Sequence, residues 1–259
     1  NDRRYVGDDE GFVPAESLGV AGDAPTELLS LAAAGDLPAV AGATAERVPG
    51  SQLSFDAPLA PAESGKLWGI GLNYAEHASD LDEQRPDDPA SFFKPATTLT
   101  GPGGPIRLPP TDVTDRVTAE AELGLVVGRT CSDVAVADAD DVVAGYVPVI
   151  DVTAEDVLER NPRFLTRAKS FDTFLVVGPW IATPAAVADL DSITVRTVVN
   201  GEVRAENEVA NMHHSPRELL AYHSKSTTLH PGDLISTGTP GAHEISPGDA
   251  VTAEVESVG

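Results

Sequence analysis

The sequence is poor in cysteine and has no long apolar run. Its 259 residues include a single cysteine, Cys131, which excludes a disulfide within the chain. No segment approaches the roughly 20 consecutive apolar residues of a membrane-spanning helix. Residues 1–10 are polar and charged, which indicates no signal peptide, and because no initiator Met is present we expect a few residues before Asn1. These features predict a cytoplasmic protein without a membrane partner.

Basic residues are also scarce. Lys and Arg total 17 against 41 Asp and Glu, giving a formal charge of −24, and only four residues are lysines. An acidic protein repels phosphate groups, so nucleic acid is excluded as an expected partner. The acids are spread along the chain, which favours a solvated folded surface over a disordered acidic tail. A high negative charge of this kind predicts a salt-adapted, halophilic source.

Several common catalytic signatures are absent from the sequence. It contains no Gly-x-x-x-x-Gly-Lys phosphate loop, no His-Glu-x-x-His zinc helix and no Gly-x-Ser-x-Gly nucleophile elbow. Gly69-x-Gly71 lacks the third glycine of a dinucleotide-binding fingerprint. P-loop, zincin, serine-hydrolase and dinucleotide-dependent chemistries are therefore disfavoured.

The composition changes near residue 65. Residues 1–64 are rich in Ala, Pro and Gly, with a helical signal at 26–34 and a linker-like stretch at 58–65. We therefore predict a small N-terminal domain and linker at 1–64 and a catalytic domain at 65–259.

The catalytic part shows short apolar runs broken by Gly and Pro. These runs predict strands at 67–72, 123–127, 142–150, 174–177, 193–199 and 234–236. Short helices are predicted at 155–160 and 216–223, and Asn200-Gly201 predicts a hairpin turn. Many strands with few helices predict a β-rich α+β fold.

Two glutamates form the strongest local signal for chemistry. Glu120 and Glu122 are two residues apart at the start of an apolar strand, so both side chains project from one face, with Cα atoms roughly 7 Å apart. Asp151 ends the apolar run 145–150, where a buried strand can deliver a side chain to a site. Such carboxylates are typical ligands of a hard divalent ion. The alternative is that the two glutamates are solvated edge residues of a very acidic protein.

A series of segments, in this order along the chain, resembles the fumarylacetoacetate hydrolase superfamily. The segments are WGIGLNYAEH at 68–77, FFKP at 92–95, Glu-x-Glu at 120–122, DVTA at 151–154, AKSFDTF at 168–174, GPW at 178–180, VNGE at 199–202 and PGDLISTGTP at 231–240. The resemblance runs from about Lys66 to the end of the sequence, about three quarters of the chain. The resemblance implies a mixed β-sandwich roll as the catalytic fold and a homodimer as the assembly.

The resemblance also implies roles for individual residues. It implies a Mg²⁺ or Mn²⁺ ion, which Ca²⁺ can replace in a crystal, held by Glu120, Glu122 and Asp151. Catalytic roles fall on His77, Asp80 and Lys169, and the loop that closes on the substrate carboxylate is Thr237, Gly238 and Thr239.

The candidate catalytic residues also have interpretations that involve no catalysis. His77 and Asp80 would form a surface pair on a helix, and Lys169 would form a structural ion pair. Lys94 is predicted to be structural rather than catalytic. Exposed loop positions are predicted for the remaining histidines of interest, His213, His214 and His230.

The sequence departs from the family pattern in three places. Asp80 stands where the family often has Glu, and Glu155 stands where many members carry an Arg that contacts a second substrate carboxylate. Segment 161–165 resembles members that dehydrate 2-keto-3-deoxy sugar acids. We therefore expect a substrate with a neutral or hydroxylated tail.

These features predict a metal-dependent enzyme acting on a small 2-oxo acid. Hydrolysis of a C–C bond in an acylpyruvate-like substrate is the first hypothesis. Isomerisation or decarboxylation of 2-hydroxy-dienedioates or oxaloacetate-like acids is the second, and dehydration of a 2-keto-3-deoxy sugar acid is the third. A metal-stabilised binding protein without turnover is the hypothesis of a different class.

Overall fold

The protein is described here by a computed structural model that covers residues 3–21, 25–59, 65–74, 87–187 and 189–259. The strands are β1 (Tyr5–Asp8), β2 (Gly11–Pro14), β3 (Leu67–Gly71), β4 (Ala90–Lys94), β5 (Leu99–Thr100), β6 (Val117–Val127), β7 (Val143–Ala154), β8 (Leu175–Val177), β9 (Thr194–Val199), β10 (Glu202–Glu208), β11 (Leu234–Ser236), β12 (Ala242–Ile245) and β13 (Val251–Val255). The α-helices are α1 (Pro25–Ala34), α3 (Glu155–Arg160), α4 (Leu165–Lys169) and α5 (Pro216–Ser226).

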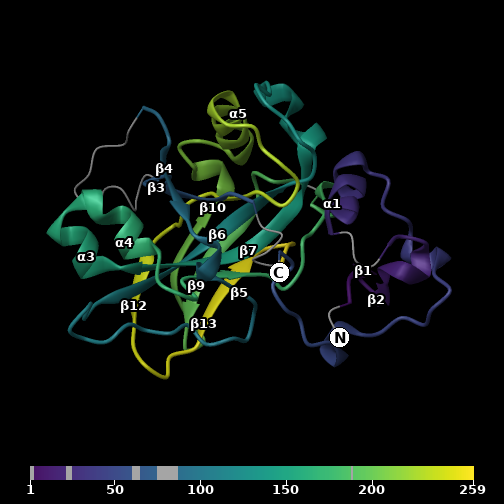
Figure 1. The fold of residues 1–259 in the computed structure, drawn as a ribbon. Coiled ribbons are helices and arrows are strands. Elements are labelled where there is room, and N and C mark those ends of the chain that lie inside the picture. Colours follow the sequence, from purple (N-terminus) through teal and green to yellow (C-terminus); the bar gives the residue numbers. More distant parts are fainter. Residues whose placement is uncertain (1–2, 22–24, 60–64, 75–86, 188) are drawn as a thin grey trace.

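An eight-stranded mixed sheet forms the body of the fold. Its order is β4-β3-β11-β6-β7-β8-β5, and β12 pairs with the N-terminal end of β6, from Val117 to Glu120. The pairs β11–β3 and β5–β8 are parallel, and the other pairs in this sheet are antiparallel. A second sheet, β10-β9-β13, lies close to the first, and the helices sit at the periphery (Figure 1). This arrangement confirms the predicted β-rich α+β fold.

The two central strands are apolar and buried along their whole length. Every residue of β6 and β7 is buried, because the sheet is covered on both faces. One apolar cluster joins Leu123 and Leu125 of β6 to Val195 of β9 and Leu219 of α5. Leu123 and Leu125 alternate with Glu120 and Glu122 along β6, so this cluster fills one face of the sheet and the acidic side chains project from the other.

The N-terminal segment packs against the central sheet. Leu29 of α1 and Leu59 share an apolar cluster with Val126 and Val147, and the Ser30 hydroxyl donates a hydrogen bond to Gly128 O at 3.0 Å. The division into domains at residue 64 stays a prediction. No helix within the described ranges is long and apolar enough to span a membrane.

Several predicted elements have different bounds in the structure. Helix α3 has the predicted range and α5 is three residues longer, whereas β6 begins six residues before the predicted strand and β7 continues four residues beyond it. Asp151 therefore lies inside β7, not at its end as predicted. The cause is pairing with β6, since the ladder between the two strands continues to Val117 and Ala154.

Candidate metal centre

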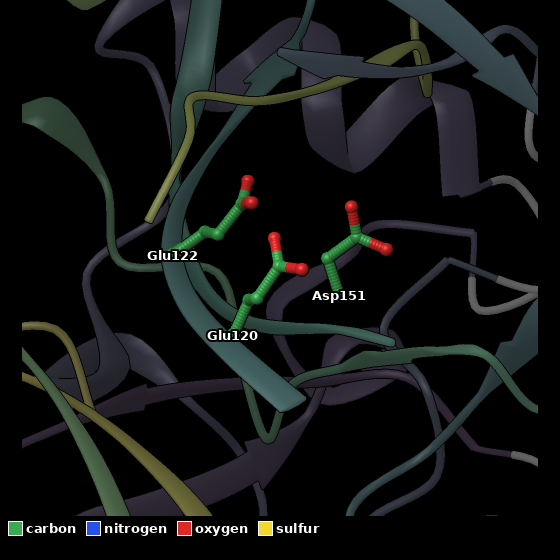
Figure 2. Close-up of side chains that lie close together, drawn as sticks. All are labelled: Glu120, Glu122 and Asp151. Carbon is green, nitrogen blue, oxygen red and sulfur yellow. The ribbon is translucent and has the colours of Figure 1, made fainter. Parts of the chain in front are cut away.

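The β6–β7 ladder brings three carboxylates together. Glu120 and Glu122 project from one face of β6, and Asp151 of β7 is the direct register partner of Glu120. One oxygen from each residue lies within 4.8 Å of the others, and the three side chains turn toward a common point (Figure 2). Glu122 and Asp151 are each 1% exposed and Glu120 is 7% exposed. The convergence is as predicted, and the alternative of solvated edge glutamates is wrong.

Neutral donors orient two of the carboxylates. The Thr153 hydroxyl donates to Glu120 Oε1 at 2.6 Å. The Ser236 hydroxyl and the Gly238 N–H both donate to Glu122 Oε2, at 2.5 and 2.9 Å. Such groups behind a candidate ligand fix its direction, and for Glu122 they leave Oε1 for a cation.

Two buried lysines face the carboxylates. Lys169 Nζ lies 3.1 Å from Glu120 Oε2 and 2.9 Å from Asp151 Oδ2, with its ammonium group also over the Phe92 ring. Lys94 pairs with Asp151 Oδ1 and lies 3.4 Å from Val152 O. The cluster of three carboxylates and two ammonium groups therefore carries one excess negative charge when all five are ionised.

The electrostatics follow from burial and from this crowding. Burial, and then the charges of Asp151 and Glu120, raise the pKa of Glu122 to about 8. Burial alone would raise the pKa of Asp151, but the two lysines outweigh it and lower that pKa. Burial would lower the pKa of Lys169, yet the three carboxylates raise it. For Lys94, burial dominates and lowers the pKa.

The residues present fit a hard divalent cation. The donor set consists of carboxylate oxygens, the ligand type of Mg²⁺ and Mn²⁺. The Tyr74 hydroxyl is buried without a hydrogen-bond partner in the described part of the chain, and burial, followed by the charge of Glu122, raises its pKa. A buried hydroxyl without a partner is suited to a polar ligand.

The remaining predicted site residues fall into two groups. Gly238 lies against Glu122, whereas the Thr237 and Thr239 hydroxyls donate to backbone carbonyls, Leu123 O at 2.8 Å and Gly241 O at 3.1 Å. His77 and Asp80 lie outside the described residues. The roles of all these residues stay predictions.

Some residues of the centre were not recognised in the sequence. Lys94 was expected to be structural, a role that its ion pair with Asp151 fits, but its place beside a candidate ligand was not predicted. The alternation of side chains along a strand could have indicated this, because Lys94 lies on the same face of β4 as buried Phe92, whereas Phe93 is exposed. Thr153 and Ser236 carried no comparable signal. His214 was expected to be exposed but is half-buried, since Asn73 holds its backbone.

Comparison with known proteins assigns the family. Residues 66–259 match the family described as Fumarylacetoacetate (FAA) hydrolase C-terminal. The chain belongs to the fumarylacetoacetate hydrolase family. It is therefore a metal-dependent enzyme of a group that contains hydrolases, isomerases and decarboxylases.

Three relatives illustrate the range of this family. The 4-hydroxyphenylacetate degradation bifunctional isomerase/decarboxylase of Escherichia coli is 41% identical over 203 residues, which are 78% of this chain but only 47% of that protein. The 5-carboxymethyl-2-hydroxymuconate delta-isomerase of Mycobacterium smegmatis has a TM-score of 0.74 and 38% identity, covering 84% of this chain and 81% of that one. The maleylpyruvate hydrolase of Sphingobium sp. SYK-6, solved with manganese (II) and pyruvate, has a TM-score of 0.81 and 28% identity, covering 99% and 93%.

Proposed function

We propose that this protein is a Mg²⁺- or Mn²⁺-dependent enzyme that hydrolyses a C–C bond in a small, acylpyruvate-like 2-oxo acid. The observation that carries the proposal is the buried convergence of Glu120, Glu122 and Asp151, with Lys169 between two of them. The similarity to a maleylpyruvate hydrolase solved with manganese and pyruvate supports both the metal and the 2-oxo acid.

The chemistry divides between the ion and the chain. Glu120, Glu122 and Asp151 would hold a divalent ion, which would supply a Lewis acid for the oxygens of a 2-oxo acid. Lys169 Nζ, buried and held by Glu120 and Asp151, provides a fixed positive charge where negative charge develops on the 2-oxo oxygen. The apolar walls formed by β6 and β7 exclude bulk water and strengthen these interactions.

Proton transfer is assigned to His77, with Asp80 orienting it, and substrate carboxylate binding to the loop Thr237, Gly238 and Thr239. The support is the resemblance of these segments to the family. Water activation or proton movement by an imidazole is the expected general-base role.

Isomerisation or decarboxylation of a 2-hydroxy-dienedioate is the second candidate. The observation in its favour is that the two relatives at 38% and 41% identity are an isomerase and a bifunctional isomerase/decarboxylase. Both reactions need the same stabilised enolate-like charge beside the ion, so the centre serves either one. The choice between the two reactions depends on the loops that contact the substrate and limit its length.

The charge of the substrate tail follows from Glu155. This residue begins α3 directly after β7, is half-buried, and accepts a hydrogen bond from the Thr118 hydroxyl at 3.1 Å. Thr118 shares its face of β6 with Glu120, so acidic groups continue along that face to Glu155. A carboxylate tail there would meet repulsion, which supports a monocarboxylic substrate with a neutral or hydroxylated tail.

Finer features of the protein belong to the same proposal. We expect a homodimer working in a salt-rich cytoplasm, with the catalytic domain at 65–259 preceded by a small domain at 1–64. The support is the family resemblance, the scarcity of lysine and the formal charge of −24.

A substrate panel tests the function. The protein is loaded with Mg²⁺ or Mn²⁺ and assayed with an acylpyruvate, a 2-hydroxy-dienedioate, oxaloacetate and a 2-keto-3-deoxy sugar acid. The panel includes one matched pair that differs only in a terminal carboxylate. We expect turnover of the acylpyruvate, seen as loss of enol absorbance, and preference for the member of the pair without the terminal carboxylate. Mn²⁺ binding without turnover of any compound would favour the non-catalytic hypothesis.

A further inference from the structure

A buried asparagine lies next to the carboxylate cluster without touching it. Asn73 follows β3 and is 2% exposed. Its side-chain Nδ2 donates to Thr237 O at 2.7 Å and to His214 O at 2.9 Å, and its Oδ1 accepts from His214 N at 2.9 Å. Both donors of the carboxamide are therefore used, and three distant segments of the chain meet at this one side chain.

A single peptide unit links the Asn73 side chain to Glu122. The Thr237 carbonyl and the Gly238 N–H belong to the same planar group and point in opposite directions. Asn73 holds the carbonyl end, while the N–H end donates to Glu122 Oε2 at 2.9 Å. The direction of this N–H is thus tied to the position of the Asn73 amide, and hydrogen bonds in such a chain strengthen one another.

The backbone conformation at Gly238 explains why such a restraint is useful. Gly238 has φ of +99°, a conformation that glycine adopts readily and other residues rarely do. A Cβ added there would lie 2.8 Å from Asn73 Cβ, so the two segments are closer than a residue with a side chain at 238 would allow. Because glycine allows many backbone conformations, the bond from Asn73 adds to the two bonds from Thr237 to Leu123 O in keeping this N–H aimed at Glu122.

We propose that Asn73 is a positioning residue for the metal centre. It orients the Thr237–Gly238 peptide, and that peptide, together with the Ser236 hydroxyl, fixes Glu122 Oε2. Glu122 Oε1 is thereby left to bind the cation. The inference rests on the proposed metal site and adds a residue that no ligand list would contain.

The test is Mn²⁺ binding to the full-length, metal-stripped protein, measured by calorimetry and by the electron paramagnetic resonance signal of Mn²⁺. Asn73→Ala is expected to weaken Mn²⁺ binding about 10- to 100-fold, the usual effect of losing a group behind a ligand. Asn211→Ala is the matched control, because Asn211 is exposed and its amide bonds only to Asn207 among the described residues. That control should bind Mn²⁺ as the wild type does.

A double-mutant cycle separates positioning from a general structural effect. If Asn73 acts through Glu122, Asn73→Ala should cost little further Mn²⁺ affinity in a Glu122→Ala background. Additive losses in the cycle would overturn the inference.

A second variant covers the case in which Asn73→Ala does not fold. Asn73→Asp has nearly the same shape and keeps the acceptor for His214 N but lacks both donors. Its added negative charge would by itself favour Mn²⁺, so weaker binding reports the lost donors, and binding tighter than wild type overturns the inference. A wild type that binds no Mn²⁺ would overturn the proposed function and this inference together, whereas normal wild-type binding with unaffected Asn73 variants would overturn the inference alone.

Discussion

Acidic side chains occupy two opposite environments in this protein. On the surface, carboxylates such as Glu202 and Glu206 have side chains 70% and 58% exposed and form single ion pairs with arginines. In the centre, Glu122 and Asp151 are 1% exposed and are surrounded by lysines and hydrogen-bond donors. Solvated carboxylates repel one another weakly because water and salt screen their charges, whereas buried carboxylates must be paired or neutralised. The same residue type therefore confers solubility in one region and cation affinity in the other.

The largest contrast is expected from Glu122→Gln. This change keeps the shape of the side chain but removes the charge of a candidate ligand, so Mn²⁺ affinity should fall by at least ~100-fold and turnover should be lost. Glu206→Gln, the same change on the exposed face of β10, should alter neither quantity. Calorimetric Mn²⁺ titration and the substrate assay measure both. Wild-type Mn²⁺ affinity in Glu122→Gln would exclude Glu122 as a ligand.

Removing the charge of the buried Lys169 side chain should show how the centre is stabilised without metal. Lys169→Met leaves Glu120 and Asp151 without one of their partners, which should cost roughly 3–5 kcal/mol in the metal-free protein. Added Mn²⁺ should restore most of this loss, although turnover stays low. Lys225→Met, at an exposed position, is the control. Thermal unfolding with and without Mn²⁺ decides, and an unchanged metal-free midpoint would show that the ion pair contributes little.

Glu155 lies between the two environments, and its charge should affect specificity. Glu155→Gln is expected to improve kcat/KM for a substrate with a terminal carboxylate by roughly 30-fold relative to its matched neutral partner, corresponding to ~2 kcal/mol of repulsion. Glu159→Gln, one turn further along α3 with a side chain 60% exposed, should leave the ratio unchanged. Wild-type preference for the dicarboxylate would contradict this assignment and favour the isomerase hypothesis.

The surface acids should respond to salt more than the centre does. Since repulsion among exposed charges is screened by ions, the thermal midpoint should rise by several degrees from low to molar potassium chloride. Mn²⁺ affinity should change much less over the same range. The effect of ionic strength on the ion itself is corrected by measuring Mn²⁺ binding to a small chelator in the same buffers. A midpoint independent of salt would refute the halophilic interpretation while leaving the enzyme proposal intact.

The smallest effect is expected from a buried base. His223 is 1% exposed, donates from Nδ1 to Leu219 O at 2.6 Å, and accepts from the Ser91 hydroxyl at 2.7 Å. Burial lowers its pKa, so the unfolded chain takes up a proton near pH 6.5 that the folded state resists. Stability from the neutral ring is therefore present above pH 6.5 and is lost as pH falls below it.

His223→Gln should flatten this acid-side loss between pH 7 and pH 5, and exposed His230→Gln should not. Denaturant unfolding across that pH range measures the difference. Parallel curves for wild type and His223→Gln would show that the loss has another origin.

Some features of the site were predictable because they depend on local geometry. The two-residue spacing of Glu120 and Glu122 requires a shared face in any strand, and the apolar residues after them require burial. The position of Asp151 was found from its apolar run, although the run suggested a strand end and the structure shows a strand interior. Lys169 was found from its apolar neighbours and from the family resemblance.

Other features depend on pairings between distant segments. Ser236 and Glu122 are 114 residues apart, and they meet because β11 pairs with β6. Lys94 reaches Asp151 from β4, which belongs to the same sheet only through β3 and β11. No local pattern encodes which strands become neighbours, because that choice depends on the packing of the whole core.

The sequence by itself determined the acidic surface, the β-rich class, the family and the candidate ligands, since each depends on composition, short-range periodicity or ordered motifs. Only the tertiary structure decided that two lysines, not one, face those ligands, and that Asn73 reaches Glu122 through the peptide at Gly238. The physical reason is range. Side-chain direction along a strand is set within two residues, whereas hydrogen bonds across the sheet arise only once segments far apart in sequence have packed together.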